Sequence, residues 1–158
     1  MPGISINHVS LSVVDMEASL RFYTEFLGME RIPGPQFGFR VEWLRVGDLE
    51  LHLFERETEA PQYHHVGFAV PNFEDLYVRA KAAGILVHMP PFAQVTELPD
   101  GGAQMYVRDP GGNLIELDTP DASTLDREVV PMRRLVDAVP QSDQNLRATL
   151  FLEPRAAD

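Results

Sequence analysis

Apolar and polar positions follow the same order twice along the chain. The stretch from Ile4 to Val13 alternates and is rich in β-branched residues, which predicts a strand. Apolar residues then recur at helical spacing up to Gly28, which ends the predicted helix. The stretch from His65 to Val70, followed by a helical pattern up to Gly84, repeats this order. An internal repeat of this length predicts two copies of one supersecondary unit.

Each predicted helix begins at a residue that favours the N-cap position, Asp15 in the first copy and Asn72 in the second. Gly47 and Asp48 predict the turn of a hairpin, and the stretch 32–38, with two prolines and two glycines, is expected to be a loop. Further strands are predicted at 39–46, 49–54, 85–89, 94–98, 103–108 and 114–118.

This order predicts an α+β fold made of two modules, each with a strand, a helix and three further strands (βαβββ). The first module is expected to span residues 1–58 and the second residues 59–120. The periodic pattern stops after Pro120, so residues 121–158 are interpreted as a C-terminal tail, with a helix expected between Ser142 and Phe151. The pattern leaves open whether the tail packs on the core or on a partner subunit.

Composition narrows the class of protein. The chain has 158 residues, 44% hydrophobic and 23% charged, which is typical of a globular domain. We expect no membrane association, because the sequence has no long apolar run, and a cytoplasmic location, because no secretory signal is visible. The absence of cysteine excludes disulfides and thiolate metal ligands. A net charge of −11 argues against nucleic acid as a partner.

Strand parity places several polar side chains on one face of the predicted sheets. Ile115 and Leu117 are apolar and are expected to face the helix, so Glu116 between them faces the other way. The same reasoning turns three histidines away from the helices: His8, His65 and His52. Imidazole and carboxylate groups suit a divalent metal such as Zn, Ni, Co, Mn or Fe.

The same histidines and carboxylates could have purely structural roles instead of binding a metal. A single histidine on a half-buried strand is more often a hydrogen-bonded structural residue than a ligand. Two histidines at equivalent positions of the repeat, with an inward carboxylate, favour the metal site. Glu50 competes with His52 for the same face. His64 has the opposite parity to His65, and His88 is assigned no role.

The residues resemble the vicinal oxygen chelate superfamily. This superfamily includes glyoxalase I, methylmalonyl-CoA epimerase, the fosfomycin-resistance thiol transferases, extradiol dioxygenases and bleomycin-binding proteins. Asn7-His8-Val9, with the helix that ends at Gly28, is similar to the opening of these proteins, and 109–117 (DPGGNLIEL) is similar to a closing motif of the family. The resemblance covers residues 4–120. It implies that the paired modules form a cupped mixed sheet that holds a metal.

For site residues, the resemblance implies His8, His65 and Glu116 as metal ligands and His52 at the place of a fourth ligand, where histidine departs from the usual Glu or Gln. Glu116 is also the candidate catalytic base. Side chains of matching parity are expected to line a substrate cavity: Ser10, Trp43, Phe54 and Tyr106. For Trp43 and Tyr106, simple core packing is an equal alternative.

The function predicted from this is a metal-dependent lyase or isomerase of glyoxalase I type acting on a small molecule. The metal would polarise a carbonyl or enolate oxygen while a carboxylate moves a proton. One alternative is a non-haem Fe(II) ring-cleaving dioxygenase, since two histidines and one glutamate match its ligand set. Another is a metal-free binding or resistance protein. A thiol transferase is favoured less, because the sequence shows no basic cluster that would bind a phosphonate. We expect a homodimer, as is common in the resembling family, with modules that pair within one chain or between chains.

Overall fold

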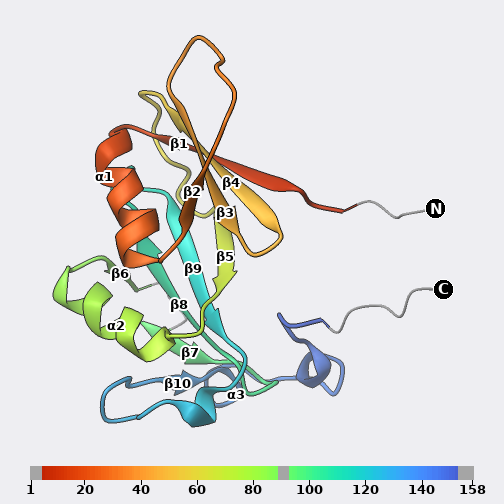
Figure 1. Ribbon diagram of the computed structural model, residues 1–158. Helices are drawn as coiled ribbons and strands as arrows, with labels where there is room; N and C mark the ends of the chain where they lie inside the picture. The colour runs from red at the N-terminus through yellow and green to blue at the C-terminus, as the bar shows by residue number, and fades with distance from the viewer. Residues whose placement is uncertain (1–4, 89–92, 153–158) are drawn as a thin grey trace. The chain divides into compact units, whose positions relative to one another are not determined.

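The computed structural model describes residues 5–88 and 93–152, which form two compact units. Unit 1 contains residues 5–66 and 108–114, and unit 2 contains the other described residues. The order of strand, helix and strands occurs twice along the chain, and the α+β class predicted from the sequence is confirmed (Figure 1). We describe each unit by itself.

The sheet of unit 1 has four strands in the order β1-β4-β3-β2. β1 is parallel to β4, whereas β2, β3 and β4 are antiparallel neighbours. The predicted hairpin is confirmed, because Val46 pairs with Leu49 across a turn in which Gly47 has a φ of +56°. Part of the predicted loop is a strand instead, since β2 pairs with β3 up to Ile32. The strands are β1 (His8–Val13), β2 (Glu30–Ile32), β3 (Val41–Val46) and β4 (Leu49–Glu55).

Helix α1 (Met16–Arg21) begins where predicted, because the side chain of Asp15 accepts a hydrogen bond from the backbone N–H of Ala18. The helix then widens into one π-helical turn, Phe22–Phe26, which the sequence pattern did not indicate. Phe22 and Tyr23 are both buried in this turn. Gly28, with a φ of +76°, ends the helical segment.

The second sheet has the strand order β10-β7-β8-β9-β5, and β6 also pairs with β8. Helix α2 (Phe73–Ala82) follows β5 and buries Phe73, Leu76, Tyr77 and Ala80. Its N-cap is Asn72 as predicted, although the Asn72 side chain makes no capping hydrogen bond. The strands are β5 (His65–Ala69), β6 (Leu86–Val87), β7 (Val95–Glu97), β8 (Ala103–Arg108) and β9 (Leu114–Thr119).

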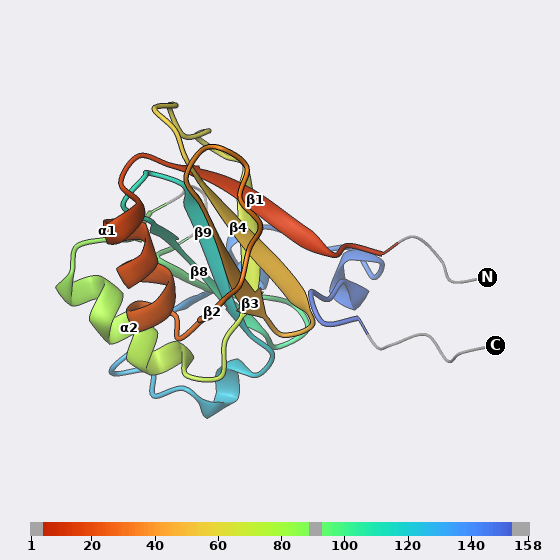
Figure 2. The ribbon, with the colours of Figure 1, turned by 45° about the horizontal axis from the view of Figure 1, so that its top comes forward.

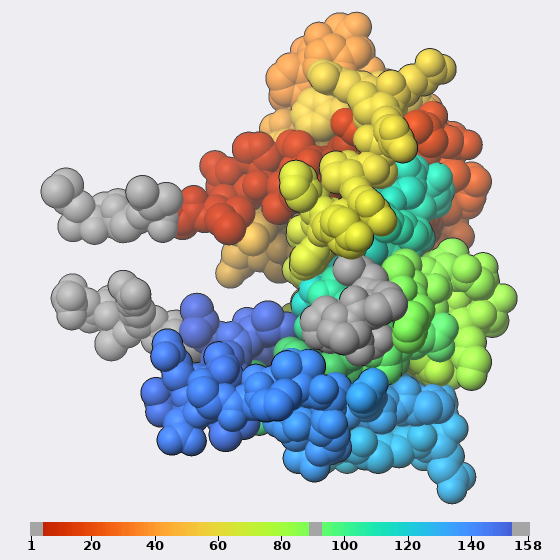
Figure 3. Space-filling model, turned by 180° about the vertical axis from the view of Figure 1, so that it is seen from behind, coloured from red at the N-terminus to blue at the C-terminus, as the bar shows by residue number. Residues whose placement is uncertain are grey.

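The tail packs on unit 2 through β10 (Arg133–Arg134), which lies parallel to β7. It also contains a 3₁₀ turn at Ala122–Thr124 and helix α3 (Leu135–Ala138). The helix expected between Ser142 and Phe151 is reduced to a single 3₁₀ turn, Asn145–Arg147. Figure 2 shows this segment again from a second direction, and Figure 3 shows in blue the surface that the tail forms.

The helices in the described ranges 5–88 and 93–152 are all too short or too polar to cross a lipid bilayer.

Candidate metal and substrate site

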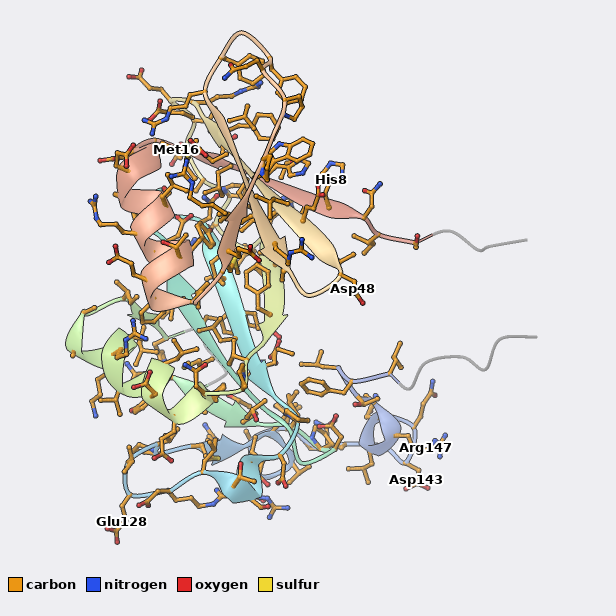
Figure 4. All side chains as sticks on the ribbon, in the orientation of Figure 1. His8, Met16, Asp48, Glu128, Asp143 and Arg147 are labelled. Carbon is orange, nitrogen blue, oxygen red and sulfur yellow. The ribbon has the colours of Figure 1, made fainter. Side chains whose placement is uncertain are left out.

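Three rings stack across neighbouring strands of unit 1. The imidazole of His52 on β4 lies 4.1 Å from the Trp43 indole of β3 and 4.4 Å from the His8 imidazole of β1, measured between ring centroids. The interplanar angles are 6° and 15°. Figure 4 labels His8 on β1, where its side chain stands clear of the ribbon. The stack confirms that these three side chains share one face of the sheet.

Two of the three stacked rings, Trp43 and His52, have defined neighbours. The backbone of Gly34, in the segment after β2, lies so close to Trp43 that a Cβ added to Gly34 would be 3.0 Å from the indole. His52 is almost fully buried, and its Nε2 is 2.8 Å from Oε2 of Glu50. His8, in contrast, is exposed. The middle ring, His52, is therefore the most buried of the three, whereas Trp43 is half-buried and His8 is exposed.

Hydrogen bonds orient the two histidines that occupy equivalent positions of the repeat. Nδ1 of His8 is 2.7 Å from Oδ1 of Asn7, and Nδ1 of His65 is 2.9 Å from the carbonyl oxygen of Tyr63. Both oxygens accept, so in each ring Nδ1 carries a proton and donates it. A histidine that binds a metal commonly donates its other ring N–H to an oxygen in this way.

By residue type, the candidate ligands suit a divalent metal. Two imidazoles and the carboxylate of Glu116 form a nitrogen and oxygen ligand set. Within either unit, the described residues contain no cluster of three or more histidine or acidic side chains that could hold a cation. The ligand set combines His8 and His65 of unit 1 with Glu116 of unit 2, so its assembly stays a prediction.

Polar side chains are buried on one face of the sheet in unit 2. Glu116 and Asp118 of β9 are each 6% exposed. Burial raises the pKa of Asp118 to about 8, and the charge of Glu116 together with a hydrogen bond to it adds to this shift. Asp118 therefore keeps its proton near neutral pH and donates it to Glu116. One oxygen of Asp118, Oδ1, is buried without a hydrogen-bond partner.

Tyr106 of β8 belongs to the same group. Burial raises the pKa of its hydroxyl, and the hydrogen bond to Glu116 and the nearby negative charges act in the same direction. The Tyr106 hydroxyl thus stays neutral and donates to Glu116. The carboxylate of Glu116 is held by two neutral donors, Tyr106 and protonated Asp118.

The turn between β8 and β9 has a structural role in unit 1. The carboxylate of Asp109 is buried and accepts hydrogen bonds from the Tyr23 hydroxyl at 2.8 Å and from both N–H groups of Asn113 at 2.8 and 2.9 Å. The Asn113 side chain also donates to the backbone oxygen of Ser12 at 2.9 Å. This network joins the turn to helix α1's π-helical extension and to β1, the strand that carries His8.

The structure adds residues that the sequence reasoning missed or left open. Asp118 was not singled out, although its position two residues after Glu116 places it on the same face of β9. Glu50 was treated as a competitor of His52, whereas in the structure the two side chains are hydrogen-bonded.

Of the predicted cavity residues, Trp43 and Phe54 are half-buried in unit 1. Ser10 is exposed and lies opposite His52 in the register of β1 and β4. His64 and His65 both line a pocket of about 450 Å³.

Comparison with known proteins identifies the class. The Glyoxalase/Bleomycin resistance protein/Dioxygenase superfamily matches residues 5–117. The uncharacterized protein PA2024 of Pseudomonas aeruginosa is 32% identical over 126 residues, which cover 71% of this chain and 86% of the relative. Glutathione transferase FosA of Serratia marcescens is 31% identical over 121 residues, 72% of this chain and 79% of the relative.

Two further comparisons indicate the same superfamily. The human mitochondrial methylmalonyl-CoA epimerase is 25% identical over 134 residues, 72% of each chain. The crystal structure of a putative glyoxalase family protein from Bacillus anthracis has a TM-score of 0.59 and 26% identity, covering 77% of this chain and all of that one. The chain therefore belongs to the Glyoxalase/Bleomycin resistance protein/Dioxygenase superfamily, as its sequence motifs predicted.

Proposed function

We propose that this protein is a divalent-metal-dependent lyase or isomerase that moves a proton on a small-molecule substrate. The observation that carries the proposal is the pair Glu116 and Asp118, two carboxyl groups on one face of β9 that are each 6% exposed and lie beside Tyr106 of β8. Buried carboxyl pairs of this kind are suited to accept and return a proton. Similarity to a methylmalonyl-CoA epimerase supports the same class of reaction.

In this proposal, His8 and His65 bind the metal through Nε2 and Glu116 binds it through its carboxylate. When bound, the metal acts as a Lewis acid that polarises a carbonyl or enolate oxygen. His52 keeps its place as the proposed fourth ligand, and because Glu50 occupies its Nε2, it would use Nδ1.

Residues of this chain then transfer the proton. Glu116 accepts it from the carbon next to the carbonyl group and returns it to that carbon. Asp118 and Tyr106 donate hydrogen bonds to Glu116 and so hold the carboxylate in one orientation. Since burial has already removed most of the surrounding water, these interactions are stronger than they would be in solution.

The test compares His65→Ala with His64→Ala, a neighbouring histidine of opposite parity. The protein is purified without added metal, and its metal content is measured before and after addition of Ni, Co, Zn or Mn. We expect His65→Ala to lose the metal and His64→Ala to keep it. Unchanged metal content in His65→Ala would exclude His65 as a ligand.

Activity is tested on the same samples. We expect proton exchange with heavy water, followed by NMR, on an α-hydroxy-carbonyl thioester or a hemithioacetal. Purified protein that contains iron and consumes oxygen with catechols would instead support the dioxygenase alternative. Protein that binds none of these metals would support a metal-free binding protein and refute the proposal.

We also propose that the protein is a homodimer. Because His8 lies in unit 1 and Glu116 in unit 2, a site built between subunits can be distinguished from one built within a chain. His8→Ala and Glu116→Ala are each expected to lose the metal. If their mixture regains metal binding after exchange of subunits, the site is shared between chains, and if it does not, the modules pair within one chain. A monomer in light-scattering measurements would refute the homodimer.

A further inference from the structure

A row of aromatic rings leads from the His8–His52–Trp43 stack to the exposed edge of unit 1. The Phe54 ring lies 6.5 Å from the His52 ring, and the Phe39 ring lies 6.0 Å from the Phe54 ring. Phe37 continues the row, 5.9 Å from Phe39. These side chains come from β4 and from the segment between β2 and β3.

The outer part of this row is open. Phe37 and Phe39 are 49% and 45% exposed, which is unusual for two large apolar side chains that contact each other. Phe39 also lines a groove of about 790 Å³, together with Trp43 and the other residues of segment 31–43 except Phe37. Phe39 therefore borders a space large enough for a small molecule, and Phe37 lies next to Phe39.

A cation lies on the same rings. The guanidinium carbon of Arg56 is 5.3 Å from the centre of the Phe39 ring and 5.6 Å from that of Phe54. Two other arginines near the groove are paired with carboxylates, Arg31 with Glu42 and Arg40 with Glu17. No carboxylate in the described part of the chain forms an ion pair with Arg56.

Carboxylates outnumber basic groups in this chain, whose net charge is −11. The adjacent Glu55 is engaged elsewhere, because it accepts a hydrogen bond from the backbone N–H of Met16 and lies 3.8 Å from Arg40. The guanidinium of Arg56 is held over the two rings and keeps donors for a planar anion.

We infer that this surface, formed by Phe37, Phe39, Phe54 and Arg56, binds an aromatic substrate that carries a carboxylate. The aromatic ring of the substrate stacks on the exposed phenylalanines and its carboxylate accepts hydrogen bonds from Arg56. The inference rests on the proposed function for the reaction, since the row of rings ends at the proposed ligand His8, but the binding itself requires no metal.

Calorimetric titration with three probes tests this inference in metal-free buffer of low salt. Naphthalene-2-carboxylate is aromatic and anionic, 2-naphthylmethanol is aromatic and neutral, and octanoate is anionic without a ring. We expect the intact protein to bind naphthalene-2-carboxylate more tightly than either of the other two probes, by about tenfold.

Two variants separate the contributions of charge and ring. Arg56→Gln is expected to weaken binding of naphthalene-2-carboxylate by about tenfold and to leave 2-naphthylmethanol unchanged. Phe39→Leu keeps an apolar side chain and is expected to weaken both aromatic probes. Arg45→Gln is the matched control, because Arg45 is an exposed arginine paired with Glu30, and it should bind all probes as the intact protein does.

Equal affinity of the intact protein for all three probes, or no binding of naphthalene-2-carboxylate, would overturn the inference. So would an equal loss of affinity in Arg45→Gln and Arg56→Gln, since that would indicate only the general effect of charge. Circular dichroism checks that each variant is folded. Because the titrations need no metal, loss of the proposed metal site and loss of this binding surface are separate outcomes.

Discussion

Removal of one hydroxyl group tests the role of the network at Asp109. Tyr23 is fully buried, and its hydroxyl donates a 2.8 Å hydrogen bond to the Asp109 carboxylate. Tyr23→Phe removes this donor and leaves the ring in place. A hydrogen bond to a charged group contributes about 1.5–3 kcal/mol to stability. Asp109 keeps two donors from Asn113, so we expect a loss near the middle of this range, about 2 kcal/mol.

Urea unfolding and thermal melting measure this loss. For a chain of this size, about 2 kcal/mol corresponds to a fall in Tm of about 4–8 °C. Tyr77→Phe is the matched control, because Tyr77 is also a buried tyrosine on a helix but makes no hydrogen bond through its hydroxyl in the described residues. Equal stability of Tyr23→Phe and the intact protein, or an equal loss in Tyr77→Phe, would refute the reasoning.

The pH dependence of the free energy of unfolding provides a second check on the Tyr23–Asp109 hydrogen bond. Burial, the charge of Asp109 and the hydrogen bond to it raise the pKa of Tyr23 well above its ordinary value. Above pH 10 the unfolded tyrosine ionises and the folded one does not, so the folded state binds more protons and the free energy of unfolding falls as pH rises. The stability difference between the intact protein and Tyr23→Phe should therefore become smaller above about pH 10.

Two further predictions concern the candidate site. Gly34→Val places a side chain against Trp43 and should move the indole, lowering stability by about 1–3 kcal/mol and changing the emission of the chain's single tryptophan; an unchanged emission spectrum would argue against the close packing. The raised pKa of Asp118 means that the folded state binds more protons than the unfolded state between its ordinary pKa and about 8, so stability falls as pH rises through this range. Asp118→Asn should reduce this dependence in urea unfolding between pH 5 and pH 8.5, and parallel curves for the variant and the intact protein would contradict the shift.

Local sequence patterns predicted most of the elements because each depends on nearby residues. Asp15 caps α1 through its own side chain, and the left-handed backbone at Gly28 and Gly47 is one that other residues rarely adopt. Strand parity placed His52 and Trp43 on one face, and the structure confirms it. The π-helical turn was missed, because one extra residue in a turn leaves no clear periodic signal.

Contacts between distant residues could not be predicted in this way. Strand alternation puts Glu50 and His52 on the same face but does not say that they form a hydrogen bond, or that the His52 ring lies parallel to two others. The burial of Asp118 is also a tertiary property, since the same residue on an open strand would ionise normally. The metal ligands and the homodimer stay predictions.

The sequence by itself determined the superfamily, the repeated order of elements and the residue types available for chemistry, because these depend on local pattern and on residue identity. Only the tertiary structure decided that Asp109 and Asn113 join the last turn to the π-helical turn after α1 and to β1, that Asp118 keeps its proton beside Glu116, and that Arg56 lies on two aromatic rings. The physical reason is that burial, hydrogen-bond partners and pKa values are set by groups that are far apart in sequence and are brought together only by folding.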